Sequence, residues 1–475
     1  MPQALVVGGY ASNTAGDRTY IAQLNGTANL DRPSIMPRGT DRKSAVVNEL
    51  ARVNRNSMTG AAPALDALKA QGLLTSYEVN PLSNTVTYSV AEGRTAEAWK
   101  VMNAIEGVGQ ITRDREVRLI DPIDVKSTDR VLMEFSDVTP NAIEWNVDRV
   151  KAPQVWEQGF KGQGITVGIV DTGADVAHPA LKNAYRGTKA DGTFDHNYNF
   201  FDAIAAKKEA YDDNSHGTHV AGTVLGRTPE GYTTGVAPEA KFIASKILSG
   251  SGNGTLQGVI KGLEWMLAPT DSEGKNADPS KAPDIISNSW GTSNGKDTTF
   301  KNLLNAFLAA GIEPVFAAGN SGPRAGSLGS PGSYPEVISV GATDKADKVA
   351  SFSSRGPSPI KDAAGSDKKP DISAPGHQIT SSFPGGKWGT ISGTSMATPA
   401  VSGVIALILS KYKDLTHDEV VKAITTSATD IDAAGYDYNS GHGLINAEAA
   451  LKAADALVAA RPAKPAPAKV GTAAA

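Results

Sequence analysis

The chain has 475 residues and a formal net charge of −4, with 40% apolar residues, 20% charged residues and no cysteine. This composition supports a large buried core spread over several domains, and it gives no reason to expect nucleic acid or an anionic membrane as a partner. The lack of cysteine excludes disulfides, thiolate zinc sites and a cysteine nucleophile.

Membrane and export signals are absent from the sequence pattern. No apolar run reaches the roughly 18 residues of a membrane span, and we expect the apolar segment 401–409 to be a buried helix. Residues 4–7 are apolar but too short for the core of a signal peptide, and no basic leader precedes them.

Residues 1–120 are predicted to form a separate unit in which helices cover one face of a small antiparallel sheet. Alternation and turn residues predict strands, and helical spacing predicts helices that the small residues 59–62 separate. An unrelated α+β binding domain is the alternative for this unit. The expected strands are 19–24, 74–79, 85–90 and 116–120, and the expected helices are 44–55, 63–71 and 95–105.

A polar segment, 121–140, is predicted to be a linker, and residues 141–458 a second domain. In that domain apolar strands alternate with helices, which favours a mainly parallel sheet covered by helices on both faces, an α/β fold. Residues 459–475 are rich in Pro, Ala and Lys, typical of a disordered tail or a linker to a further domain. The expected strands are 165–171, 241–246, 284–288, 313–317 and 337–342.

Three short motifs supply an acid, an imidazole and a hydroxyl in chain order. Asp171 lies in Ile-Val-Asp-Thr-Gly at the end of an apolar strand, His216 in Asn-Ser-His-Gly-Thr-His, and Ser395 in Gly-Thr-Ser-Met-Ala-Thr-Pro. A histidine can take the proton of a serine that is otherwise a poor nucleophile, and a buried carboxylate can hold that histidine in the right tautomer. The motifs therefore indicate nucleophilic catalysis by Ser395.

Spacing alone leaves alternatives for each position. His219 shares a helix face with His216, and the two histidines could form a zinc pair, although neither a following Glu nor a third ligand is evident. Asp175 is a rival carboxylate, and Ser395 could be a helix N-cap only.

Together with these motifs, further segments make residues 141–451 resemble the subtilisin-like serine proteases, or subtilases, and segment 144–150 is most similar to the bacillopeptidase F branch. Ala-Ala-Gly-Asn-Ser-Gly at 317–322 is similar to the oxyanion-hole segment of that family. Ser-Trp-Gly at 289–291 and the segment 250–254 resemble the two walls of its substrate cleft.

The resemblance implies an Asp171–His216–Ser395 triad in a subtilisin-like fold, with His219 as a packed neighbour. It also implies an oxyanion hole of the Asn320 amide and the Ser395 N–H, with Thr394 in support. Small residues at the floor of the pocket and the lack of an acid in 327–334 predict a large apolar P1 residue over a basic one. The implied substrate-binding residues are Ser251, Gly252, Asn253, Ser289, Trp290, Gly291, Gly319 and Gly329.

The same resemblance implies a secreted endopeptidase whose export signal has been removed, made as a self-processing proenzyme. Residues 1–120 would be a ferredoxin-like propeptide that inhibits the enzyme intramolecularly. We expect the scissile bond in the polar linker, with Leu132, Met133 and Phe135 as P1 candidates because they are its largest apolar residues.

Partners and cofactors follow from this interpretation. The expected partners are protein or peptide substrates and the propeptide, and the expected state is a monomer without nucleic acid or a membrane span. No cofactor is required for the chemistry, although oxygens of loop 191–196 and Asp202 could hold structural calcium. The rival functions are a pseudoprotease that binds peptides without cutting them and a calcium-dependent structural domain.

Overall fold

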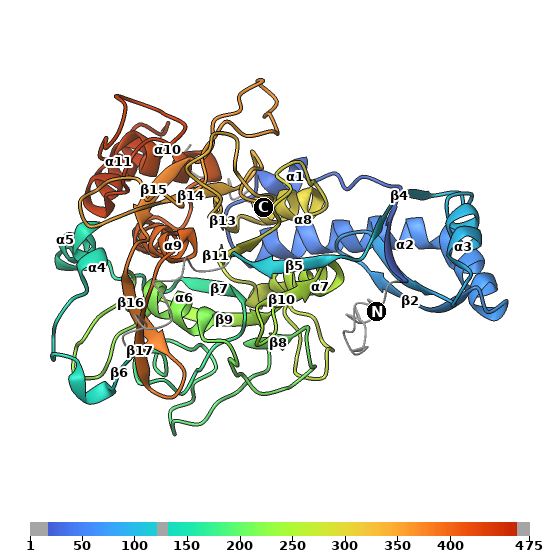
Figure 1. Cartoon of the computed structure of the whole chain (residues 1–475), viewed down its shortest axis with the longest axis horizontal. Coiled ribbons are helices and arrows are strands. Elements are labelled where there is room, and N and C mark those ends of the chain that lie inside the picture. Colours follow the sequence, from blue (N-terminus) through green and yellow to red (C-terminus); the bar gives the residue numbers. More distant parts are fainter. Residues whose placement is uncertain (1–17, 121–131, 463–475) are drawn as a thin grey trace, which may run out of the picture.

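The computed structural model describes residues 18–120 and 132–462. Residues 18–113 form a four-stranded antiparallel sheet in the order β2-β3-β1-β4, with helices between its strands (Figure 1). This β1-α-β2-β3-α-β4 arrangement is the ferredoxin-like fold that was predicted, although the sequence pattern did not reveal β4. The elements of this N-terminal unit are β1 Thr19–Leu24, α1 Asp31–Ser34, α2 Thr40–Ala70, β2 Leu74–Asn80, β3 Thr85–Val90, α3 Thr95–Met102 and β4 Val108–Arg113.

Helix α2 corrects the prediction of two helices separated at residues 59–62. It runs unbroken through Gly60 and Pro63. One end packs in the core of the N-terminal sheet through Leu65 and Leu68, and the other packs against the second unit through Val46 and Val47. Tertiary burial at both ends therefore outweighs the local cost of Gly and Pro inside the helix.

The second unit is built on a seven-stranded sheet in the order β15-β14-β13-β11-β7-β9-β8, in which every strand pair is parallel. The five predicted strands are confirmed, to within a residue or two at their ends, and the short strands β8 and β15 were not predicted. The seven are β7 Thr166–Asp171, β8 Phe200–Asp202, β9 Lys241–Lys246, β11 Ile285–Asn288, β13 Glu313–Ala317, β14 Ile338–Thr343 and β15 Ile372–Pro375.

Helices cover both faces of this sheet, so its strands are apolar on both sides. In β7, Val167 and Ile169 pack into one core, and Val170 packs into the core on the opposite face. The first core includes α6 and α9, and the second includes α7 and α8. The helices are α4 Trp145–Arg149, α5 Ala152–Glu157, α6 His216–Leu225, α7 Leu256–Leu267, α8 Lys301–Ala310, α9 Thr394–Lys411, α10 His417–Thr426 and α11 Ala447–Ala459, with 3-10 turns at Phe135–Asp137 and Pro279–Lys281.

Helix α9 is the central helix of the molecule. By length and composition it could cross a membrane, but 89% of its apolar window is buried inside the protein. It contacts β11, β13, β14 and β15 as well as α6. Its apolar character is therefore that of a core helix.

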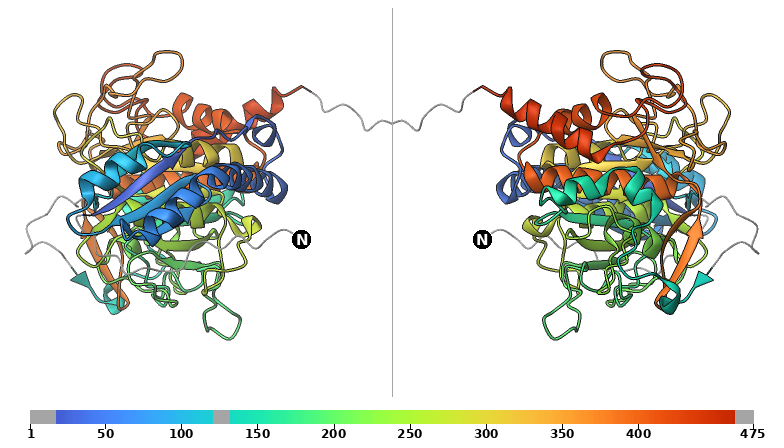
Figure 2. Two further views of the ribbon diagram at one scale, coloured as in Figure 1. Left: turned by 90° about the vertical axis from the view of Figure 1, so that its right-hand side faces the viewer. Right: turned by 90° about the vertical axis from the view of Figure 1, so that its left-hand side faces the viewer.

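The N-terminal unit lies on the α7–α8 face of the large sheet (Figures 1 and 2). Arg42 donates to the carbonyls of Leu308 (2.9 Å) and Ala309 (2.6 Å) at the end of α8. Arg38 pairs with the buried Glu313, whose other oxygen is 2.6 Å from His417 Nδ1. Burial would raise the pKa of Glu313, but Arg38 and His417 outweigh it and lower that pKa to about 2.

Two small three-stranded sheets complete the structure. In one, β5 Glu116–Leu119 lies between β10 Asn253–Thr255 and β12 Trp290–Gly291. In the other, β17 Lys387–Ile391 pairs with β16 Ile379–Phe383 and with β6 Leu132–Met133. Strand β5 was predicted, but it joins the second unit instead of the N-terminal sheet.

Candidate active site

Three elements position the acid, the imidazole and the hydroxyl. Strand β7 ends at Asp171, α6 begins at His216, and Ser395 lies in the first turn of α9. Nδ1 of His216 lies 2.8 Å from Oδ1 of Asp171, and both side chains are almost completely buried. The N–H of Thr172 also donates to Oδ1, at 2.7 Å. Since a carboxylate only accepts hydrogen bonds, this contact places the Nδ1 proton on His216 and leaves Nε2 as the basic nitrogen.

His219 lies deeper in the core. Its Nε2 is 3.0 Å from the carbonyl oxygen of Ile379, and burial lowers its pKa to about 3. A neutral imidazole bound to a backbone carbonyl is a packing group, and the zinc pair considered from the sequence has no further ligand among the described residues. Asp175 caps local turns, accepting from Ala177 N and Gly385 N, and does not contact His216.

Asp212 organises the start of helix α6, a role that the motifs did not reveal. Its Oδ1 accepts from the Thr172 hydroxyl at 2.9 Å and from the N–H groups of Asn214 and Ser215 at 3.0 Å each. Its Oδ2 accepts from the N–H (2.9 Å) and the hydroxyl (2.6 Å) of Thr218. The carboxylate thereby satisfies helix N-terminal N–H groups and joins the strand that carries Asp171 to the helix that carries His216.

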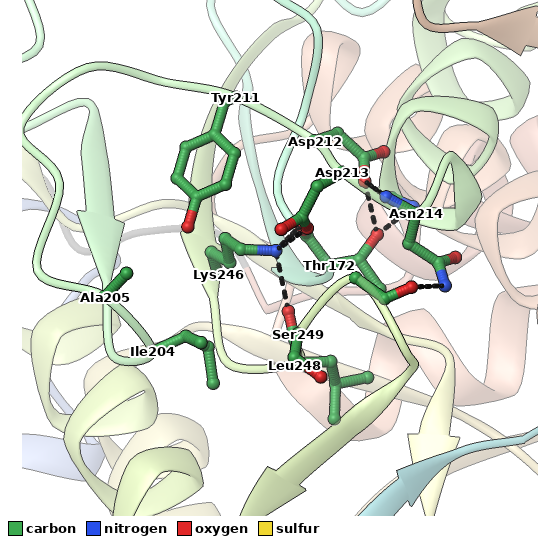
Figure 3. Close-up of polar contacts among 12 residues, drawn as sticks. Thr172, Ile204, Ala205, Tyr211, Asp212, Asp213, Asn214, Lys246, Leu248 and Ser249 are labelled. Carbon is green, nitrogen blue, oxygen red and sulfur yellow. Dashed lines mark hydrogen bonds and ion pairs between the residues drawn. The ribbon is translucent and has the colours of Figure 1, made fainter. Parts of the chain in front are cut away.

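Lys246 is a second residue that the sequence analysis missed. Its ammonium is fully buried and donates to Thr172 O (2.6 Å), Asp213 Oδ1 (2.6 Å) and Leu248 O (2.9 Å), as Figure 3 shows. It also lies 4.8 Å from the centre of the Tyr211 ring. The Lys246 ammonium therefore holds Thr172, the residue after Asp171, and Leu248, which precedes the cleft wall. Its sequence signal is a lysine at the end of the strand Lys-Phe-Ile-Ala-Ser-Lys, which is buried from its second residue onward.

Asn320 and Thr394 are held together beside Ser395. Oδ1 of Asn320 accepts from the N–H (3.0 Å) and the hydroxyl (2.9 Å) of Thr394. The amide Nδ2 is the donor end of this side chain, and Asn320 lines the cleft. The Ser289 hydroxyl donates to the backbone carbonyl of Ser395 at 2.9 Å and fixes the start of α9.

Strand β5 fills the cleft as the middle strand of an antiparallel sheet. Arg118 pairs with Asn253 on one side and Gly291 on the other, and Leu119 pairs with Trp290. The Leu119 N–H donates to Gly252 O at 2.8 Å. Ser251 lies in the adjoining turn, where its hydroxyl is 2.9 Å from that of Ser249. Both predicted walls therefore bind an extended strand, which is the chain's own.

Ile120, the residue after β5, reaches the nucleophile. The Ser395 hydroxyl is 3.3 Å from the carbonyl oxygens of Ile120 and Ser289. A groove of about 640 Å³ extends along β5 and is lined by Ile120, Gly291, Gly319 and Gly329 among others. A Cβ added at Gly319 would lie 2.8 Å from Ser354 Oγ, and one added at Gly329 would lie 2.5 Å from Thr292 O, so neither position has room for a larger residue. Among the lining residues in the described part of the chain, the only carboxylate is Glu116 of β5 itself.

The structure does not bring the P1 candidates chosen from the sequence to Ser395. Met133 pairs with Trp388 and Leu132 with Gly389, in the sheet beside β16, and Phe135 begins a 3-10 turn. Residues 121–131 of the expected linker lie outside the described residues. The size of a side chain in the linker does not determine which residue lies at Ser395. The pairing of β5 with β10 and β12 does, and it places Ile120 there.

The carboxylates considered for calcium do not converge. Asp191 accepts from Thr193, Asp195 accepts from Asn197, and Asp202 accepts from three backbone N–H groups and the Tyr211 hydroxyl. Within residues 18–120 and 132–462, no three Asp, Glu, His or Cys side chains gather in a metal-binding group. We derive no calcium site from these residues.

The parallel sheet delivers an acid to a histidine at the start of α6, and a serine lies at the start of a second core helix, α9, which is the arrangement of the catalytic triad in a serine hydrolase. Comparisons with known proteins agree. The subtilase family model (Peptidase_S8) matches residues 162–443, more than half of the chain. The chain therefore belongs to the subtilase family.

The chain is similar to several members of that family. It is 42% identical over 327 residues to bacillopeptidase F of Bacillus subtilis, a match covering 66% of this chain but only 22% of that protein. It is 32% identical over 363 residues to subtilisin E of Bacillus subtilis, covering 76% of this chain and 84% of that protein. It is 38% identical over 319 residues to the serine protease AprX of Bacillus subtilis, covering 61% and 67%.

Proposed function

We propose that this chain is the proenzyme of a serine endopeptidase, which cuts itself after Ile120 and then hydrolyses peptide bonds in proteins. One observation carries the proposal: β5 lies in the cleft as an extended strand, with the Ile120 carbonyl oxygen 3.3 Å from the Ser395 hydroxyl. A peptide bound by strand addition is held by its backbone, so many sequences can bind in the same way.

In the first step, Nε2 of His216 takes the Ser395 proton while Oγ attacks the carbonyl carbon. Asp171 keeps the Nδ1–H tautomer and stabilises the imidazolium that forms. The negative oxygen of the tetrahedral intermediate is stabilised by Asn320 Nδ2 and the Ser395 N–H at the start of α9. His216 then gives the proton to the leaving amine, and the acyl group stays on Ser395 as an ester.

In the second step, water replaces the amine. His216 removes a proton from the water, the hydroxide attacks the ester carbonyl, and the bond to Ser395 Oγ breaks with return of the proton.

The N-terminal unit is proposed to be an inhibitory propeptide. After the cut, β5 would still fill the cleft, and the contacts of Arg38 and Arg42 with the α8 region would still hold the unit. The proposed organisation is propeptide 1–120, linker 121–140, catalytic domain 141–458 and tail 459–475. We further propose that the mature enzyme acts as a secreted monomer, as the resemblance to subtilases implies.

Labelling with an organofluorophosphonate tests this function. We expect the processed protein, once separated from its N-terminal fragment, to be labelled at Ser395 and to hydrolyse casein. We expect Ser395→Ala to lose both properties while staying folded. Catalysis of roughly 10³ over water can remain in such a variant through binding and the oxyanion hole. A folded wild-type protein that binds peptides but is neither labelled nor hydrolytic would instead be a pseudoprotease.

A further inference from the structure

Arg115, just before β5, joins the two walls of the cleft. Its backbone carbonyl accepts a hydrogen bond from Leu256 N at 3.0 Å, at the start of α7. Its guanidinium crosses to the opposite side and pairs with Asp297, in the loop between β12 and α8. The basic side chain therefore reaches a carboxylate that belongs to the catalytic unit.

Asp297 is held rigidly. Its side chain is only 5% exposed. Its Oδ1 accepts from the N–H (3.1 Å) and the hydroxyl (2.7 Å) of Thr299, and its backbone carbonyl accepts from the Ser330 hydroxyl at 2.7 Å. The remaining oxygen, Oδ2, is the one that faces Arg115. A nearly buried carboxylate is costly unless a cation or further donors compensate it, so this position favours a cationic partner.

The register of β5 shows how many residues separate the Arg115–Asp297 pair from the scissile bond. With the Ile120 carbonyl at Ser395, Arg115 is the sixth residue before the cut bond. The groove that holds Ile120 also extends to Arg115 and is lined by Thr292, Ser293 and Asn294 of the loop that leads to Asp297. The residues that the catalytic unit contributes to this lining are all uncharged. Asp297, at the end of the loop that contains Thr292, Ser293 and Asn294, is therefore the acidic group of the catalytic unit that pairs with Arg115.

We propose that Asp297 forms a remote subsite for a cationic side chain, guanidinium above all, six residues before the cut bond. The inference rests on the proposed function, and it extends the site from the chain's own β5 to external substrates. A planar guanidinium fits because it can pair with a carboxylate at the far end of a long side chain.

Arg118 provides a matched comparison on the same strand. Its side chain is 67% exposed, and it pairs with Glu116 of β5. An exposed pair of this kind contributes little because water and salt screen it. We therefore expect charge at the third residue before the cut to matter much less than charge at the sixth.

The test uses the self-processed enzyme, separated from its N-terminal fragment so that β5 no longer fills the cleft, and internally quenched peptides that begin with Arg-Glu-Val-Arg-Leu-Ile. The first residue is varied among Arg, Lys, citrulline and Glu, and a control set exchanges the second Arg for citrulline. Citrulline keeps the size of Arg and removes its charge. We expect kcat/KM to be about three- to tenfold higher for Arg than for citrulline at the first position. This ratio should fall with added salt, and it should approach one in Asp297→Asn.

Because the readout is a ratio within one enzyme, it does not depend on the total activity of the variant. Equal kcat/KM for the Arg and citrulline peptides in the wild type would overturn the subsite, and so would a ratio that Asp297→Asn leaves unchanged. A ratio at the control position as large as that at the first position would also overturn it. If no peptide were cleaved, the proposed function itself would be contradicted. Cleavage of all peptides with equal kcat/KM would contradict only the subsite.

Discussion

The buried ammonium of Lys246 holds together the segments that carry the acid and the histidine. It bonds the carbonyl that follows Asp171, the carboxylate of Asp213 and the carbonyl of Leu248. Asn214, next to Asp213, donates to Gly250 O at 2.9 Å and links the same loop to the cleft wall (Figure 3). The catalytic geometry therefore depends on a residue that touches no substrate.

Lys246→Met should lower both stability and turnover. The variant keeps the length of the side chain but leaves two carbonyls and Asp213 without their donor, which should cost about 3 kcal/mol in the free energy of unfolding. Misplacement of the Asp171 loop should lower kcat about tenfold or more. The matched control is Lys241→Met at the other end of β9, where the ammonium is on the surface and bonds Asn183 O. Denaturant unfolding and peptide kinetics measure both effects, and equal losses in the two variants would contradict this role.

The two histidines of α6 should respond differently to substitution. His216→Ala removes the proposed base and should lower kcat by about 10⁴-fold or more. His219→Ala removes a neutral buried ring and should cost about 2–3 kcal/mol of stability with a much smaller change in kcat. Measurements of kcat on each variant, with circular dichroism to check that the protein is folded, separate these effects. A comparable loss of kcat in well-folded His219→Ala would show that His216 was wrongly assigned as the base.

At the scale of residues, the motifs place Asp171 at a strand end and His216 and Ser395 at helix starts, whereas the resemblance to subtilases implied Asn320. Lys246 bonds Thr172 and Asp213, and Asp212 bonds the Thr172 hydroxyl. Adjacency in sequence does not reveal such contacts between segments. The choice between His216 and His219 could not be made from spacing, since residues three apart share a helix face.

Among the elements, strand β5 has the most direct functional consequence. The sequence pattern predicted a strand at 116–120, but alternation does not say which sheet a strand joins. The structure places it between β10 and β12, in the cleft. The long parallel strands were predictable because they are continuously apolar, whereas α2 was predicted in two pieces because its burial against both units outweighs Gly60 and Pro63.

The pocket around Ile120 predicts an apolar preference at P1. The lining residues from the catalytic unit are Gly, Ser, Thr and Asn, so a basic P1 side chain would lose hydration without gaining a carboxylate. We expect kcat/KM for Leu or Phe at P1 to exceed that for Arg or Lys by at least about tenfold, equivalent to ~1.4 kcal/mol. Peptides identical except at P1 test this, and a preference for Arg would refute the pocket assignment.

Across the whole molecule, the two units meet around Glu264 of α7. Its Oε1 accepts from the N–H groups of Leu82 (3.0 Å) and Ser83 (2.6 Å) in the β2–β3 turn. Burial raises the pKa of Glu264 to about 7, against the lowering effect of these hydrogen bonds. Glu78 and Lys261, which form an ion pair, lie nearby.

Binding of the N-terminal unit should therefore weaken as pH rises. If release returns the pKa of Glu264 toward 4.5, the complex holds a proton between about pH 4.5 and 7 that the separated enzyme does not. This contribution is full below pH 4.5 and is lost as pH rises through about 7. Glu264→Gln should keep the acceptor and flatten most of the dependence. Burial also raises the pKa of Asp114, which acts in the same direction. Inhibition constants of the cleaved N-terminal fragment across pH measure this, and an unaltered slope in Glu264→Gln would contradict it.

We propose that Ser395 cuts the chain after Ile120. Intact-mass analysis of purified wild type and Ser395→Ala, expressed in parallel, tests it most directly. We predict that the wild type yields an N-terminal fragment ending at Ile120, and that Ser395→Ala remains a single chain of 49.3 kDa. A fragment ending at Leu132, Met133 or Phe135, or equal processing of Ser395→Ala, would contradict the account.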